Sequence, residues 1–301
     1  MSLLVTGSIG IDTIQTPAGQ AADVLGGSAI YFSFAASLLH PVRLVGVVGE
    51  DFPRRYLDLF QGRPIDIRGL EIRKGSKTFR WQGRYVGDMN EAETLRTDLN
   101  VLAESAPKVP AEFRDSKVVF LANTHPALQR ELLAQVTKPE FVVCDTMNLW
   151  IKTTREELCK TLAAVDGVVL NDAEAKLLTT ENLLVRAGRQ IQRMGPKLVL
   201  IKKGEHGALM FHGNDVWALP ALPTADLVDP TGAGDSFAGG TMGYLAKVGN
   251  YGAETIKAAI AHGAVAATFA IEAFSLDGLR RATPDDFNAR FKQYCRMLAV
   301  A

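Results

Sequence analysis

The sequence has 301 residues, of which 47% are hydrophobic, and its 33 basic side chains balance its 33 acidic ones. A chain this apolar can bury a large core, and its composition excludes a disordered, collagen-like or disulfide-rich protein. A neutral chain without a basic tail or block also lacks the charge that sequence-independent binding of nucleic acid requires.

Short β-branched runs alternate with helix-like segments along most of the chain. The runs are continuously apolar, which is typical of strands covered on both faces. They lie at 3–6, 43–48, 118–121, 141–144, 168–170 and 198–201, and the candidate helices between them at 28–39, 127–136, 154–164, 172–178 and 183–194. After this region the pattern changes to successive helices, at 235–248, 252–269 and 284–297. The alternation predicts an α/β fold with a doubly wound, mostly parallel sheet flanked by helices.

One segment, 69–97, breaks this rhythm. Residues 77–85 alternate aromatic and polar side chains before a polar turn at 87–90. Alternation with a period of two predicts a strand with one wet face, so we expect this segment to form a small flap outside the main sheet. No repeat or linker divides the chain, so a single domain over 1–301 is expected.

Cysteine usage and the N-terminal residues bear on the cellular compartment. The three cysteines, Cys144, Cys159 and Cys295, are widely spaced and show no zinc-binding pattern. We interpret them as reduced thiols of a cytoplasmic protein. The first residues lack a basic segment and Asp12 interrupts their apolar run, so secretion is not expected. The most apolar stretch, 258–270, is too short to span a bilayer and predicts a buried helix.

The most informative stretch is Asp-Pro-Thr-Gly-Ala-Gly-Asp-Ser-Phe-Ala-Gly-Gly, at 229–240. Glycines around Ala233 let backbone amides approach a ligand, and the following helix would present its positive N-terminal dipole there. Asp235 would lie in the first helical turn, where the dipole keeps a carboxylate ionised beside a bound phosphate. Such a carboxylate can accept the proton of an alcohol during phosphoryl transfer. A glycine-rich turn with Asp235 as a helix cap is the alternative.

This stretch closely resembles the signature of the ribokinase-like (PfkB) carbohydrate kinase family, and every signature position is filled. The resemblance extends over nearly the whole chain and implies a ribokinase-like fold, with a lid formed by roughly 12–25 and 69–97. It implies an ATP-dependent kinase that phosphorylates a hydroxyl of a small carbohydrate-like acceptor, with Mg²⁺ and with K⁺ as a further candidate ion. The exposed face of the lid suggests a homodimer formed by lid pairing.

The same resemblance assigns the catalytic residues. The family aspartate that matches Asp235 is the general base. The family amides that match Gly232, Ala233 and Gly234 form the anion hole.

On the acceptor side, Gly26 and Gly27 match the family's N-terminal diglycine, which resembles a hinge and substrate contact. Asp12 matches an aspartate that binds acceptor hydroxyls, and the paired acceptors of a carboxylate suit vicinal diols. A tight turn and a surface turn residue are the alternatives. Asn123 and Asp145 each follow a predicted strand and resemble residues near the acceptor, although capped turns explain them equally well.

The sequence departs from many sugar kinases at one position, where Tyr31 replaces an asparagine that contacts the sugar. This difference argues against transferring ribose or fructose specificity. Tyr31, Phe79, Trp81 and Tyr85 could form an aromatic wall over a nucleoside base or the apolar face of a cyclic polyol. They could equally form the core of the flap or a dimer contact.

On the nucleotide side, Asn171 and Glu174 reproduce the family's Asn-x-x-Glu element, which resembles a site that organises Mg²⁺ and phosphate through water. A capping box at the start of a helix is the structural alternative. Lys202, Gly204 and Gly207 match the family's nucleotide-side Gly-x-x-Gly turn. A hairpin turn explains that pattern equally well.

Four further residues are assigned by the resemblance. Thr231 lies inside the signature and is placed with the nucleotide-binding residues. His262 lies where the family packs a small-residue helix against adenine, although close helix packing explains it as well. Asp229 and Ser275 fall near positions that often bind a monovalent cation.

Other functions are weighed against this interpretation. A dinucleotide-binding oxidoreductase would explain the α/β pattern, but residues 7–10 lack the full Gly-x-Gly-x-x-Gly fingerprint. A catalytically silent relative, acting as a regulatory or binding module, would be expected to lose Asp235 or the glycines beside it. A nucleoside or inositol-type kinase of the same family stays open, because the sequence shows no pocket shape. No nucleic-acid or membrane partner is expected.

Overall fold

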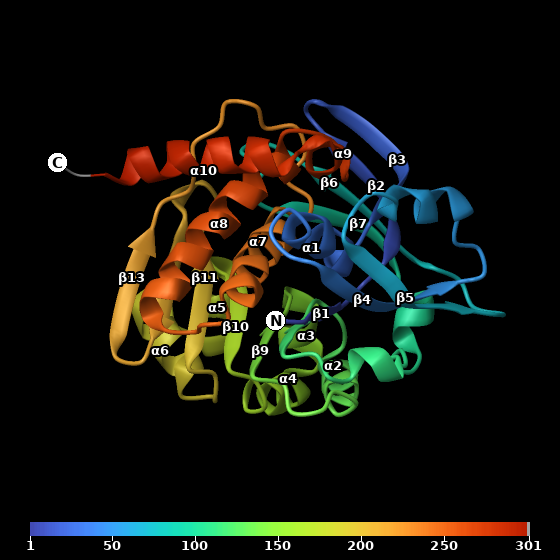
Figure 1. Cartoon of the computed structure of the whole chain (residues 1–301), viewed down its shortest axis with the longest axis horizontal. Coiled ribbons are helices and arrows are strands. Elements are labelled where there is room, and N and C mark those ends of the chain that lie inside the picture. Colours follow the sequence, from blue (N-terminus) through green and yellow to red (C-terminus); the bar gives the residue numbers. More distant parts are fainter. Residues whose placement is uncertain (300–301) are drawn as a thin grey trace.

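The computed structural model describes residues 1–299 and contains a nine-stranded main sheet and a separate four-stranded sheet (Figure 1). The strands of the main sheet, in spatial order, are β13 (Asp215–Leu219), β12 (Ala208–His212), β11 (Leu198–Lys202), β10 (Gly167–Asn171), β9 (Phe141–Asp145), β8 (Val118–Leu121), β1 (Leu3–Thr6), β4 (Val42–Gly49) and β5 (Ile65–Arg73). All neighbouring pairs from β11 to β5 are parallel. β12 and β13 extend the sheet as an antiparallel hairpin.

Helices cover both faces of the main sheet (Figure 1). One face carries α1 (Ser28–Ala36), α7 (Ala233–Val248), α8 (Ala253–Ile271), α9 (Asp277–Arg281) and α10 (Pro284–Leu298). The other carries α2 (Pro126–Leu133), α3 (Asn148–Thr153), α4 (Arg155–Leu162), α5 (Asp172–Thr179) and α6 (Leu184–Gln192). Successive residues of a strand point to opposite faces, so Leu3 and Val5 enter one core and Leu4 the other. Within residues 1–299, no helix has the length and apolar character that crossing a membrane requires.

The predicted strands of the main sheet agree with the structure to within one residue at each end, and the predicted doubly wound α/β fold is confirmed. β1 lies between β4 and β8, so the order of the strands reverses there. Ligands of open α/β sheets bind at the carboxyl ends of the strands near such a reversal. The sequence did not predict the short helical segments. These are α3, α9, η1 (Arg54–Phe60), η2 (Asn100–Ala103), η3 (Ala111–Phe113) and η4 (Gly204–His206).

The second sheet consists, in order, of β3 (Gly19–Gly26), β2 (Gly10–Thr16), β6 (Phe79–Tyr85) and β7 (Ala92–Asp98). Residues 69–73, which were expected to belong to the flap, lie instead in β5, where Ile72 pairs with Val48 of the main sheet. β5 is an edge strand with many half-exposed residues. Its pattern of burial therefore resembles that of a strand with one wet face.

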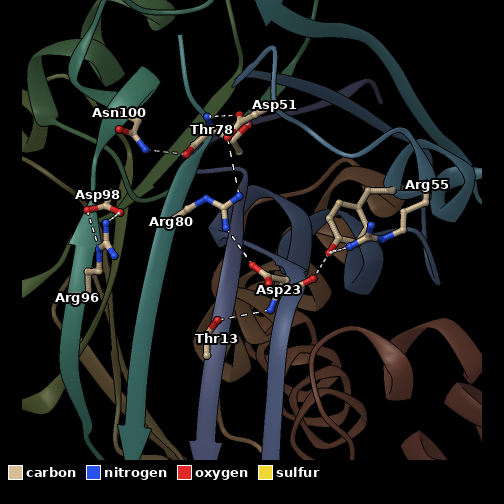
Figure 2. A network of polar contacts seen from close by, with 10 residues as sticks. Thr13, Asp23, Asp51, Arg55, Thr78, Arg80, Arg96, Asp98 and Asn100 are labelled. Atoms are coloured by element: carbon tan, nitrogen blue, oxygen red, sulfur yellow. Dashed lines mark hydrogen bonds and ion pairs between the residues drawn. The ribbon is translucent and has the colours of Figure 1, made fainter.

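Polar side chains join the second sheet to the end of β4 (Figure 2). Thr78, just before β6, is fully buried. Its amide and hydroxyl both donate to Asp51 Oδ1 at 2.7 Å, and the hydroxyl accepts from the Gly49 amide at 3.1 Å. Arg80 lies between Asp51 and Asp23, and donates to Asp23 at 3.0 Å. These contacts fix where the second sheet leaves the main sheet.

We expect Thr78→Val to lower the free energy of unfolding by about 1–3 kcal/mol, because valine keeps the shape but leaves the buried Gly49 amide without its partner. Thr13→Val is the matched control, since the Thr13 hydroxyl accepts only a 3.5 Å bond from the exposed Asp23 amide. Its effect should stay within about 0.5 kcal/mol. Urea unfolding measures both changes. Equal midpoints for Thr78→Val and the wild type would show that this junction adds no stability.

Candidate active site

The predicted phosphate site lies at the start of α7. We call residues 229–234 the glycine loop. Gly232 is the N-cap residue, with a left-handed φ of 75° and no side-chain cap. The Ala233 amide donates to the Pro230 carbonyl at 3.1 Å, whereas the Gly232 and Gly234 amides make no hydrogen bond within residues 1–299. Of the three amides expected in the anion hole, only those of Gly232 and Gly234 are therefore free to bind an anion, because the Ala233 amide already donates to the Pro230 carbonyl.

Both glycines are required by what packs against them. A Cβ at Gly232 would lie 2.2 Å from the Tyr31 ring, and one at Gly234 would lie 2.5 Å from Lys202 Nζ. Lys202 ends β11, so the main sheet delivers an ammonium group to the loop. The group that packs against Gly234 is thus a cation on a flexible side chain. An anion can pair with it at the N-terminus of α7.

Asp12 lies on the acceptor side of the loop and is 3% exposed. Its Oδ2 lies against Gly26, where a Cβ would come within 1.8 Å of it. Burial is the largest cause that raises the pKa of Asp12, and together with the charges of Asp229 and Asp235, and against the opposing effect of the Gly27 amide, it brings the pKa to about 8. Gly26 is needed here because its missing side chain leaves room for the carboxyl group, whereas a Cβ at Gly27 would lie 2.4 Å from the Ser8 carbonyl oxygen.

Three other carboxyl groups gather around Lys202. Burial raises the pKa of Asp145 well above its ordinary value, the Asp235 and Glu174 charges add to the effect, and Lys202 opposes it. Burial likewise raises the pKa of Asp235, against the effects of Lys202 and of the residue's own amide. It raises the pKa of Glu174, which Lys202 and the Asn171 amide oppose. The Lys202 ammonium group therefore acts against the raised pKa of all three carboxyl groups.

The Asn171–Glu174 pair forms the capping box that the sequence offered as an alternative. The Glu174 amide donates to Asn171 Oδ1, and the Asn171 amide donates to Glu174 Oε2, each at 2.7 Å. The capping box holds Glu174 at the carboxyl end of β10, near Lys202 and Asp235. A structural role and a role at the site are therefore compatible.

The second sheet reaches both the glycine loop and the Gly-x-x-Gly turn. Thr231 Oγ1 donates to the Tyr85 hydroxyl of β6 at 3.3 Å. Gly204 and Gly207 have φ values of 55° and 77°, and a Cβ at Gly204 would lie 3.0 Å from Asn90 Oδ1. β6 and the β6–β7 turn therefore contact the glycine loop and the Gly-x-x-Gly turn.

His262 is placed in the core. Its ring stacks between Tyr244 and Phe291, with centroids 4.0 and 3.9 Å away, and Nδ1 lies 2.8 Å from the Ala258 carbonyl oxygen. Burial lowers the pKa of His262 to about 4, so the ring is neutral at neutral pH. This packing supports the helix-packing alternative, and we remove His262 from the proposed nucleotide contacts.

Asn123 and Trp81 also have protein partners. Asn123 Oδ1 accepts from Trp150 Nε1 at 2.9 Å, and its amide nitrogen lies 3.1 Å from Met147 Sδ. Trp81 Nε1 donates to Thr94 of β7 at 3.2 Å, and its ring covers Gly83. Both arrangements favour the structural alternatives for these residues.

Asp229 links two loops. Its Oδ1 accepts from the Thr231 amide at 2.9 Å and its Oδ2 from the Ser275 amide at 3.0 Å. Ser275 Oγ in turn donates to the Leu25 carbonyl of β3 at 2.8 Å. Residues 1–299 contain no cluster of three or more His, Cys, Asp or Glu side chains suited to a metal ion. The role of Asp229 at a monovalent cation stays a prediction.

Gln129 is a residue that the sequence did not reveal. It is 1% exposed, and its Nε2 donates to the Leu121, Ala122 and Asp145 carbonyls at 2.9, 3.2 and 3.1 Å. It therefore ties the carboxyl ends of β8 and β9 together beside Asp145. A glutamine on the buried face of a predicted helix was the available signal.

A family model described as pfkB family carbohydrate kinase matches residues 3–278. The chain belongs to this family. The kinase is 33% identical over 248 residues to the cytidine kinase of Thermococcus kodakarensis. The aligned residues cover 80% of this chain and 87% of that protein. It is therefore a phosphotransferase that acts on a hydroxyl group of a carbohydrate or nucleoside.

Solved structures share the fold of the kinase. The nucleoside kinase of Burkholderia thailandensis in complex with inosine matches with a TM-score of 0.78 at 21% identity, over 97% of this chain and 98% of that one. The aminoimidazole riboside kinase of Salmonella enterica, complexed with aminoimidazole riboside and an ATP analogue, matches with a TM-score of 0.76 at 18% identity, over 97% and 100%. At these identities the likeness establishes the ribokinase-like fold alone.

Asp12→Asn should stabilise the kinase more at pH 8 than at pH 5. Asp12 in the unfolded chain ionises near the ordinary value of 3.8, whereas the folded protein keeps the proton until about pH 8. The folded state therefore loses stability as the pH rises between these values, and asparagine removes that loss. We expect the melting temperature of the variant to exceed that of the wild type by a few degrees at pH 8. A difference that does not depend on pH would contradict a buried, titrating carboxyl group.

Proposed function

We propose that the kinase transfers the γ-phosphoryl group of ATP to a hydroxyl of a nucleoside or a related carbohydrate-like acceptor, with Asp235 as the general base. The observation that carries this proposal is the position of Asp235 in the first turn of α7, beside the unbonded amides of Gly232 and Gly234. Its carboxylate can accept a proton where a phosphate oxygen can meet amides and the Lys202 ammonium.

The residues present fit a nucleotide with Mg²⁺. The N-terminus of α7 has no side-chain cap and Lys202 lies against Gly234, which together suit an anion. When bound, ATP and Mg²⁺ supply the phosphoryl group and a cation that shields its charge. Lys202 and the glycine amides would hold phosphate oxygens, and Glu174 would hold Mg²⁺ through water. Gly204, Gly207 and Thr231 would border the nucleotide, and Asp229 a monovalent cation.

On the acceptor side, Asp12 would hold a hydroxyl that does not react, and the Gly26–Gly27 turn supports it. Asp235 would take the proton of the reacting hydroxyl. Asp145, at the end of β9, would help to orient the acceptor. The 33% sequence identity to a cytidine kinase favours a nucleoside over a free sugar as the acceptor.

We further propose that 1–301 is one ribokinase-like domain and that the second sheet is its lid. The bond from Thr231 to Tyr85 and the closeness of Asn90 to Gly204 support a lid that closes over the crevice. β7 is an edge strand with nearly every residue exposed, which supports pairing with the lid of a second copy in a homodimer. The free cysteines are compatible with the predicted cytoplasmic location.

A coupled assay of ADP release tests the proposed function. With ATP, Mg²⁺ and K⁺, we expect cytidine or another nucleoside to stimulate ADP release more strongly than ribose or myo-inositol. Asp235→Asn should lower the stimulated rate by roughly 10²-fold or more, because the proton acceptor is lost.

Asp277→Asn is the matched control, since Asp277 also lies in the first turn of a helix, α9, but on the surface. It should keep the wild-type rate. Full activity of Asp235→Asn would refute the base, and a wild type that no acceptor stimulates would favour a catalytically silent relative.

A further inference from the structure

Tyr31 carries a buried hydroxyl without a partner. The residue is 1% exposed, and its hydroxyl makes no hydrogen bond to any other part of residues 1–299. Asp12 Oδ1 is also buried and has no partner in the same part of the chain. An unmade hydrogen bond of a buried group is costly. Two such groups at one site indicate that something outside the protein completes them.

The two side chains are built on the same turn. The Gly27 amide opposes the raised pKa of Asp12, and the Gly27 carbonyl accepts from the Tyr31 amide at 3.2 Å. Gly26 packs against Asp12 Oδ2. A rigid diglycine turn therefore sets the position of both groups relative to each other.

The ring of Tyr31 cannot serve as the aromatic wall expected from the sequence. It packs against Gly232 and is almost completely enclosed, so no ring face remains for a base. Burial raises the pKa of Tyr31, and the charges of Asp229, Asp12, Tyr85 and Asp235 raise it further, so the hydroxyl keeps its proton. What Tyr31 can offer a ligand is a hydrogen-bond donor.

We infer that Tyr31 and Asp12 together hold one non-reacting hydroxyl of the acceptor, with the Tyr31 hydroxyl donating to its oxygen and Asp12 accepting its proton. A hydroxyl both accepts and donates, so it completes both groups. An ether oxygen has no hydrogen to donate to the unpaired Asp12 Oδ1, and a protonated amino group has no lone pair to accept from Tyr31. Tyr31 is thus a specificity-determining residue for acceptors with a second hydroxyl. The inference rests on the proposed function.

Two tyrosine-to-phenylalanine variants test it. Tyr294 is the matched control, because it is also fully buried but its hydroxyl donates to the Pro220 carbonyl at 2.7 Å. Tyr294→Phe should lower the melting temperature and leave the KM for the acceptor unchanged. Tyr31→Phe should keep or raise the melting temperature, because it removes an unpaired polar group. It should raise the KM for the acceptor about tenfold, the factor for one hydrogen bond, with the KM for ATP unchanged.

Deoxy analogues identify the hydroxyl that is held. For cytidine, we expect either 2′-deoxycytidine or 3′-deoxycytidine to raise the wild-type KM about tenfold, as the tyrosine change does. Tyr31→Phe should then add nothing further with that analogue. If the wild type is active but Tyr31→Phe has the wild-type KM, or its effect multiplies with both analogues, the inference alone is overturned. A wild type that no acceptor stimulates overturns the proposed function as well.

Discussion

The balance of charge around Lys202 is the constraint on which the candidate site depends. Burial raises the pKa values of Asp145, Glu174 and Asp235, and the Lys202 ammonium acts against all three shifts. The parallel sheet brings these groups together, since β9, β10 and β11 are neighbours and end at the same edge. The same ammonium lies against Gly234, where a phosphate would approach. A single side chain would thus support both the ionisation of the proposed base and the binding of an anion.

The glycine loop connects this charged side to the acceptor side. Gly232 packs on Tyr31, Gly234 packs on Lys202, and Thr231 contacts Tyr85 of the second sheet. A substituent on either glycine would displace a group that belongs to the site. The second sheet is held at its other end by Thr78, just before β6, whose hydroxyl accepts from the Gly49 amide at the end of β4 and whose amide donates to Asp51. The positions of the segments around the candidate site therefore depend on one another.

The sequence predicted the buried strands, which repeat as apolar runs, and the glycine loop, which depends on residues without side chains. Strands buried on both faces are visible as apolar runs, which explains the agreement for β1 and β8. β5 was misplaced because an edge strand is half exposed in either sheet. The stacking of His262 and the enclosed ring of Tyr31 depend on contacts between distant segments, which no local pattern encodes.

The most direct test of the role of Lys202 is the dependence of kcat/KM for the acceptor on pH. The wild-type rate should rise with pH as Asp235 loses its proton. Lys202→Met removes the charge that opposes the raised pKa of Asp235, so the rise should move to higher pH. Lys203→Met, the neighbouring control, should leave it in place. A rise at the same pH in Lys202→Met and the wild type would contradict the account.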